Sequence, residues 1–101
     1  MRDEPAEIPT AKRAREIRQA VALKVRQLRQ EHGYSQEALA EACLVSRSLI
    51  SRIEQGRHEP RLSTLLAIAD TLGVAPGEFL DAVAQARSDT RLYTPINADV
   101  S

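Results

Sequence analysis

The stretch that decides the fold is SQEALAEACLVSRSLISRIEQG, residues 35–56. It predicts two short helices joined by a tight turn, because Ser35 and Ser46 each stand where a side chain can cap a helix N-terminus. The helical spacing of the apolar residues breaks at Leu44, between the two caps. Gly56 is placed to end the second helix. Helices this short bury little surface, so the rest of the chain must supply a scaffold.

The second of these helices has two different sides. Ile50 and Ile53 recur at helical spacing and mark the side that faces a core. The polar residues left over on the other side are Arg47, Ser48, Ser51 and Arg52. Guanidinium groups and hydroxyls suit a partner that offers hydrogen-bond acceptors and phosphates. The stretch therefore predicts a DNA-binding surface.

Three more helices complete the predicted scaffold, and nothing in the apolar spacing favours a sheet. Residues 11–32 contain neither Gly nor Pro, and their apolar stripe consists of Ile17, Val21, Val25 and Leu28. Residues 61–72 are apolar on most sides, so we expect this helix to be central to the core. A last helix begins near Pro76. The fold class is all-α with five helices.

We divide the 101-residue chain into three parts. Residues 1–16 form an N-terminal arm and helix extension, residues 17–86 a helix-turn-helix domain, and residues 87–101 a C-terminal tail. The tail is too short for a separate effector domain, so we expect regulation by concentration or by a partner.

The charge is zero in sum but unevenly distributed. Residues 1–34 carry 8 positive and 5 negative side chains, residues 35–72 carry 4 and 5, and residues 73–101 carry 2 and 4. A basic front can bind phosphate although the whole chain is neutral. Arg13, Arg15 and Arg18 belong either to a solvated charged face or to a basic extension that follows DNA or meets a partner subunit.

Other classes of protein fit the sequence poorly. Cys43 is the single cysteine, which excludes an internal disulfide and a cysteine-rich metal site. His32 and His58 belong to no recognisable catalytic or metal-ligand set, so we expect no enzyme activity, no metal and no cofactor. No apolar run is long enough for a membrane span or a leader peptide, so a cytoplasmic, nucleoid-associated protein is expected.

Residues 21–80 resemble the Cro/lambda-repressor-like helix-turn-helix family, also called the xenobiotic-response-element family. The resemblance is carried by LRQEHGYSQEALAE (28–41), VSRSLISRIEQGRHEPRLSTLLAIADTLGV (45–74) and PGEFL (76–80). It implies a lambda-repressor-like five-helix domain whose recognition helix, residues 46–55, lies in the major groove of double-stranded DNA.

The resemblance also implies a role for individual positions. The residues that reach base edges are Arg47, Ser48 and Arg52. Those that face the DNA backbone are Gln36, Ser46, Ser51, Gln55 and Arg57. Gln36 would also brace the recognition helix, and Ser46 and Ser51 could touch a base edge instead. Arg29 and Glu54 correspond to a structural ion pair that ties the recognition helix to the scaffold.

The chain departs from the family pattern at three helix boundaries. Leu44 stands in the turn where the family usually has Gly, and a left-handed Leu costs ~1–2 kcal/mol. Arg61 and Ala75 stand where the family often has a capping Ser or Thr. These departures concern local geometry and leave the predicted class unchanged.

Together these features predict a sequence-specific transcriptional regulator, a repressor that binds double-stranded DNA as a homodimer, because one small domain offers few contacts. The expected dimer surface on the last helix consists of Phe79, Leu80 and Val83. The alternative is a protein-interaction module, such as an antitoxin or a phage-type antagonist, that meets a protein through its N- or C-terminal arm.

Overall fold

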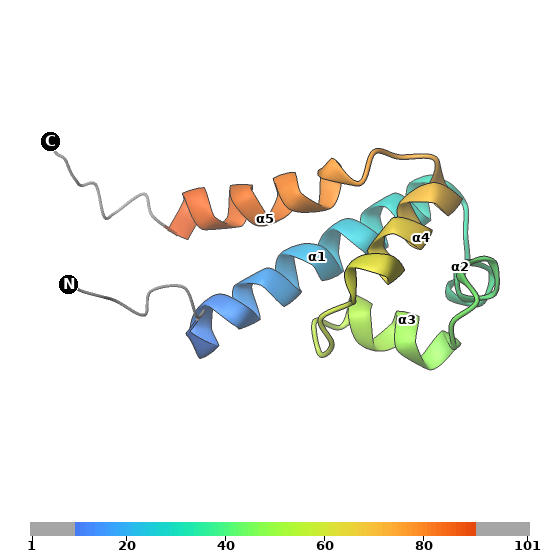
Figure 1. The fold of residues 1–101 in the computed structure, drawn as a ribbon, viewed down its shortest axis with the longest axis horizontal. Coiled ribbons are helices and arrows are strands. Elements are labelled where there is room, and N and C mark those ends of the chain that lie inside the picture. Colours follow the sequence, from blue (N-terminus) through green and yellow to red (C-terminus); the bar gives the residue numbers. More distant parts are fainter. Residues whose placement is uncertain (1–9, 91–101) are drawn as a thin grey trace, which may run out of the picture.

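Five helices form the regular structure of residues 10–90, the part of the chain that the computed structural model describes, with side chains as far as Ala86 (Figure 1). They are α1 (Ala11–Glu31), α2 (Gln36–Cys43), α3 (Arg47–Glu54), α4 (Leu62–Leu72) and α5 (Gly77–Thr90). No strand occurs within this range, which confirms the predicted all-α class. None of the described helices is long and apolar enough to cross a bilayer.

The longest helix, α1, is the scaffold for the others. The Thr10 hydroxyl accepts a hydrogen bond from the Arg13 backbone N–H at 3.1 Å, which caps the N-terminus. The predicted apolar stripe is buried at Val21, Val25 and Leu28. The helix packs along α5 and α3. It also runs without a break through the boundary that we placed between residues 16 and 17.

The two central helices begin and turn as the sequence predicts. The hydroxyls of Ser35 and Ser46 accept bonds from the backbone N–H groups of Ala38 and Leu49, at 2.9 and 3.0 Å. Leu44 adopts the left-handed conformation, with φ 59° and ψ 39°. The sharp turn at Leu44 directs α3 away from α2, although the position carries no glycine.

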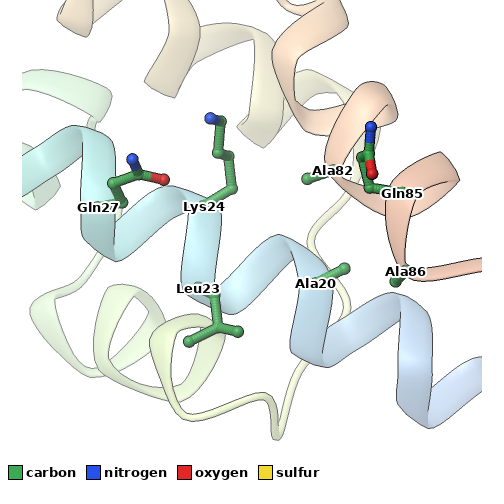
Figure 2. A pocket seen from close by; sticks show the side chains of 7 residues that line it. All are labelled: Ala20, Leu23, Lys24, Gln27, Ala82, Gln85 and Ala86. Atoms are coloured by element: carbon green, nitrogen blue, oxygen red, sulfur yellow. The ribbon is translucent and has the colours of Figure 1, made fainter. Parts of the chain in front are cut away.

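Helix α5 lies beside α1, and a shallow groove of about 310 Å³ separates part of the two helices (Figure 2). The groove is lined by Ala20, Leu23, Lys24, Gln27, Ala82, Gln85 and Ala86. Helix α5 continues to Thr90, four residues into the segment that we predicted as a tail. The segments 1–9 and 91–101 lie outside the described residues, so the protein contacts expected of the two arms stay predictions.

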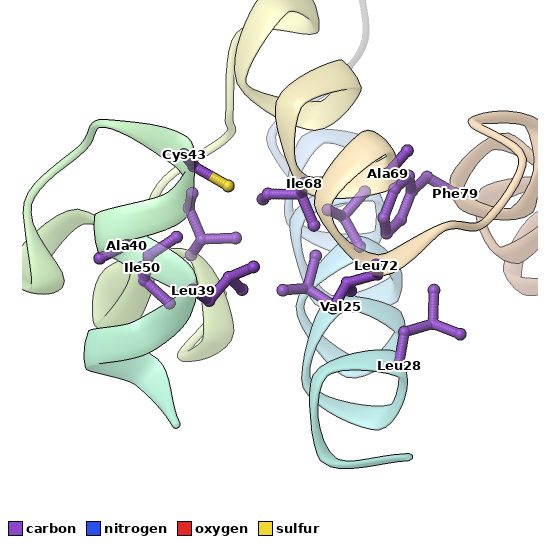
Figure 3. Close-up of a cluster of buried hydrophobic side chains, with 12 residues drawn as sticks. Val25, Leu28, Leu39, Ala40, Cys43, Ile50, Ile68, Ala69, Leu72 and Phe79 are labelled. Carbon is purple, nitrogen blue, oxygen red and sulfur yellow. The ribbon is translucent and has the colours of Figure 1, made fainter. Parts of the chain in front are cut away.

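One apolar core joins all five helices (Figure 3). Side chains with no exposed surface come from α1 (Val25), α2 (Leu39), α3 (Ile50 and Ile53) and α4 (Ile68). Cys43 is also buried, as expected for a small apolar residue, and its thiol lies 3.6 Å from the Thr71 hydroxyl. Burial of these side chains holds the short helices in place.

The expectation that α4 is central to the core is wrong for its first half. Leu62 is 70% exposed and Leu66 39% exposed, whereas Ile68, Ala69 and Leu72 are buried. The helix contacts α2 and α1, so Leu62 and Leu66 face away from the core, whereas Leu65 packs against it. Arg61 takes the N-cap position without a side-chain bond, as the absence of Ser or Thr there predicts.

The predicted dimer surface needs a correction. Phe79 is 1% exposed and belongs to the core of its own chain, so it has no surface to offer to a second copy. Val83 is half-buried against the same core. Leu80 is 68% exposed. The helical stripe predicted from spacing therefore divides into one core residue, one residue at the margin and one surface residue.

Candidate nucleic-acid interface

Helix α3 presents one side to the core and the other to solvent. Ile50 and Ile53 are fully buried, which fixes the rotation of the helix about its axis. The three predicted base-reading residues, Arg47, Ser48 and Arg52, are all exposed. The structure thus brings these three side chains to one exposed side of a helix of eight residues.

Four of the five predicted backbone contacts lie on α3 or beside its ends, and the fifth, Gln36, begins α2. Ser46 lies at the N-terminal end, where its hydroxyl oxygen accepts the Leu49 N–H and its own O–H stays available as a donor. At the other end, the Gln55 side-chain amide donates to the Ser51 hydroxyl at 3.0 Å, and Arg57 donates to the Gln55 side-chain oxygen at 3.2 Å. Ser51, Gln55 and Arg57 therefore form one hydrogen-bonded chain.

Glu54 joins α3 to two other helices. Its carboxylate oxygens accept from Arg29 Nε at 2.5 Å and Nη2 at 3.0 Å, and from the Gln36 side-chain amide at 3.0 Å. The side chains of Arg29 and Glu54 are only 11% and 4% exposed. Arg29 Nη1 also donates to the Tyr34 carbonyl at 2.7 Å. A two-pronged, largely buried ion pair of this kind has specific geometry, so it holds α1, α2 and α3 in one arrangement.

Sequence reasoning missed a second tie between α1 and the end of α3. Arg18 Nε donates to the Gly56 carbonyl at 3.2 Å. Gly56 has φ 72°, and a Cβ at this position would lie 3.4 Å from Gln19 Cγ. A glycine therefore suits both the backbone conformation and the close approach of α1. Only the basic character of Arg18 was visible in the sequence, and its bonding partner depends on the packing of α1 against α3.

The predicted base-reading residues Arg47, Ser48 and Arg52 line neither of the two hollows described for this surface. The groove of Figure 2 takes no residue from α3. A smaller hollow of about 260 Å³ lies between α1 and the end of α3, lined by Gln19, Ala22, Leu23, Glu54, Gln55 and Gly56. No group of three or more His, Cys, Asp or Glu residues that could hold a metal ion occurs within residues 10–90. Exposed guanidinium and hydroxyl groups along one side of a helix suit the groove of a duplex.

The proteins to which this chain is similar are named as transcriptional regulators. A family model described as helix-turn-helix matches residues 25–79. The chain is 36% identical over 76 residues to a hypothetical transcription factor of Neisseria meningitidis, covering 75% of this chain and 69% of the relative. It is 41% identical over 54 residues to the immunity repressor protein of Bacillus phage phi105, covering 54% of this chain but only 38% of the repressor.

A solved structure gives the same picture of the fold. The clp gene regulator ClgR from Corynebacterium glutamicum superposes with a TM-score of 0.68 and 27% sequence identity. The match covers 76% of this chain and 82% of ClgR.

Proposed function

The chain belongs to the helix-turn-helix family of DNA-binding transcriptional regulators, and we propose that it is a sequence-specific repressor that binds double-stranded DNA as a homodimer. The observation that carries the proposal is the exposure of Arg47, Ser48 and Arg52 on one side of α3, while Ile50 and Ile53 fix its other side. A recognition helix needs this combination of free polar side chains and a rigid attachment.

Arg47 and Arg52 are the proposed readers of base identity, with Ser48 beside them. A guanidinium group can donate two parallel hydrogen bonds to O6 and N7 of guanine, and this pair discriminates against other bases by about 1–3 kcal/mol. We therefore expect one or two guanines in each half of the bound site. Ser48 has a short side chain that reaches only a base edge directly beneath it.

The proposed backbone contacts surround these readers. Gln36 stands at the start of α2, where backbone N–H groups point outward and favour a phosphate. Its amide donates one N–H to Glu54 and keeps a second N–H for a phosphate oxygen. Four further residues are proposed to meet the backbone from α3 and the loop that follows: Ser46, Ser51, Gln55 and Arg57. The hydrogen bond between Gln36 and Glu54 fixes the start of α2 relative to α3, so the contacts from the two helices keep a constant spacing.

The homodimer follows from the small size of the proposed surface. A single module of this kind buries too little area for tight specific binding, whereas two copies read two half-sites about one helical turn apart. Leu80 and the exposed part of Val83 are the proposed contact between copies on α5. The repressor role is supported by the similarity to the phage immunity repressor, since a bound dimer blocks access to the DNA that it covers.

The proposal is tested with Arg52→Ala and Arg57→Ala on a duplex that carries the sequence selected by the wild-type protein and on a scrambled duplex. Arg52→Ala should remove most of the preference for the selected sequence, because it removes a base contact. Arg57→Ala should weaken binding to both duplexes alike. It should also reduce the slope of log K against log salt by about 0.9, the contribution of one phosphate contact. Fluorescence anisotropy at several salt concentrations measures both effects. Equal behaviour of the two variants would contradict the assignment of α3.

A further inference from the structure

Three cations follow one another at every third position in the first two turns of α1. They are Lys12, Arg15 and Arg18, and we call them the α1 cation row. Residues three apart are neighbours on a helix surface, so the three charges lie along one side. Lys12 and Arg15 are exposed. Among the described residues, no hydrogen bond or ion pair involves the charged groups of these two side chains.

Arg18 connects this row to the proposed DNA surface. Its Nε donates to the Gly56 carbonyl at 3.2 Å, which leaves the two terminal NH₂ groups of the guanidinium without a partner in the described part of the chain. Gly56 stands between Gln55 and Arg57, both of which are proposed backbone contacts. The row therefore begins where the proposed interface on α3 ends. In Figure 1, the N-terminal end of α1 and helix α3 both reach the lower edge of the molecule.

Two other cations of α1, Arg13 and Lys24, are arranged differently. In the first half Arg13 pairs with Glu16 at 3.4 Å, and in the second half Lys24 pairs with Glu78 of α5 at 3.5 Å. Their charges are therefore balanced by neighbouring carboxylates. Residues 11–19 contain four cations and one anion, and that anion, Glu16, is the partner of Arg13. Within residues 11–19, the positive charge without a carboxylate partner therefore belongs to the α1 cation row.

We propose that the α1 cation row contacts DNA phosphates adjacent to those met by α3 and the loop after it. The inference rests on the proposed function and extends its surface to a third helix. Charge complementarity and continuity with the Gly56 loop support this partner. Lys12 and Arg18 are six residues apart, or about 9 Å along the helix axis. Each strand carries one phosphate for about every 3.4 Å of duplex axis, so a row of this length can face about two or three phosphates.

The test removes charge from the row and compares the effect with a matched loss elsewhere on the same helix. Lys12→Gln/Arg15→Gln removes two unpaired cations of the row, and Arg13→Gln/Lys24→Gln removes two paired cations outside it. Anisotropy titration of the selected duplex at several salt concentrations gives the slope of log K against log salt. We expect the slope of the row variant to be smaller in magnitude than that of the wild type by about two, since each of the two lost phosphate contacts contributes about 0.9. The control should keep the wild-type slope, and both variants should keep the wild-type sequence preference.

Each other outcome overturns the inference in a recognisable way. If the row variant and the control have the same slope while the wild-type protein binds its sequence selectively, the row faces solvent or an acidic protein partner. If the row variant loses sequence preference, the row reads bases and is not a phosphate contact. If the wild-type protein itself prefers no sequence, the proposed function fails together with the inference, and this is evident before any variant is measured.

Discussion

The backbone of Leu44 is the clearest local departure from regular geometry. It is the one non-glycine residue with positive φ among the described residues, and its side chain is 91% exposed. The exposed leucine gains little packing in return for the strained conformation. The family resemblance indicated this position, because Leu44 stands where the family usually has Gly, but it left open whether the turn differs or the strain is tolerated. The sequence could not indicate the bond between Arg18 and Gly56, whose partners are 38 residues apart.

Leu44→Gly should stabilise the protein by roughly 1 kcal/mol, because glycine avoids the left-handed penalty of ~1–2 kcal/mol but has more freedom in the unfolded chain. Thermal unfolding should then shift upward by about 4–8 °C. Leu44→Ala is the control, since alanine keeps the Cβ that causes the penalty. A glycine variant that melts no higher than the alanine variant would show that the turn is not strained.

Among the elements, α3 depends most on its neighbours. It has only eight residues, and two buried isoleucines and the Glu54 network hold it. The boundaries of α2 and α3 could be predicted because the caps and the apolar spacing are local signals. The Arg29–Glu54 contact followed from the family resemblance. The resemblance also implied that Gln36 braces the recognition helix, and its hydrogen bond to Glu54 confirms this. Only the identity of that partner required the geometry, since an amide at a helix start has many possible partners.

Glu54→Gln should cost ~3–5 kcal/mol, because it leaves the largely buried Arg29 guanidinium without an opposite charge. Urea unfolding measures the loss as a lower midpoint with an unchanged slope. Glu78→Gln is the comparison, because the Lys24–Glu78 pair is 25% and 41% exposed and should contribute less than ~1 kcal/mol. If Glu54→Gln is no more costly than Glu78→Gln, the network does not hold α3 in place.

For the whole molecule, the sequence predicted the number and order of the helices but not how the apolar residues of α4 and α5 divide between core and surface. Helical spacing places Phe79, Leu80 and Val83 close together, yet only the packing of α5 on α1 decides that Phe79 is buried and Leu80 exposed. The same limit applies to Leu62 and Leu66 on α4. Composition identifies apolar residues, while their burial depends on the neighbouring helices.

The proposed contact between two copies of the chain depends on the exposed side chain of Leu80 on α5. Leu80→Asp should weaken association at least tenfold, because it places a charge in an apolar contact between two copies. Sedimentation equilibrium of the folded variant should show a monomer at concentrations where the wild type is a dimer. Leu62→Asp is the control, since Leu62 is 70% exposed on a different helix. A Leu80 variant that remains as dimeric as the control would place the interface elsewhere.

Selection of bound sequences from a random pool of duplexes shows whether two copies of this chain read DNA with α3. We predict enrichment of a two-fold symmetric site whose halves are separated by about one helical turn, roughly 34 Å, and contain guanine. Uniform, weak binding without an enriched sequence, or an enriched site without symmetry, would contradict it.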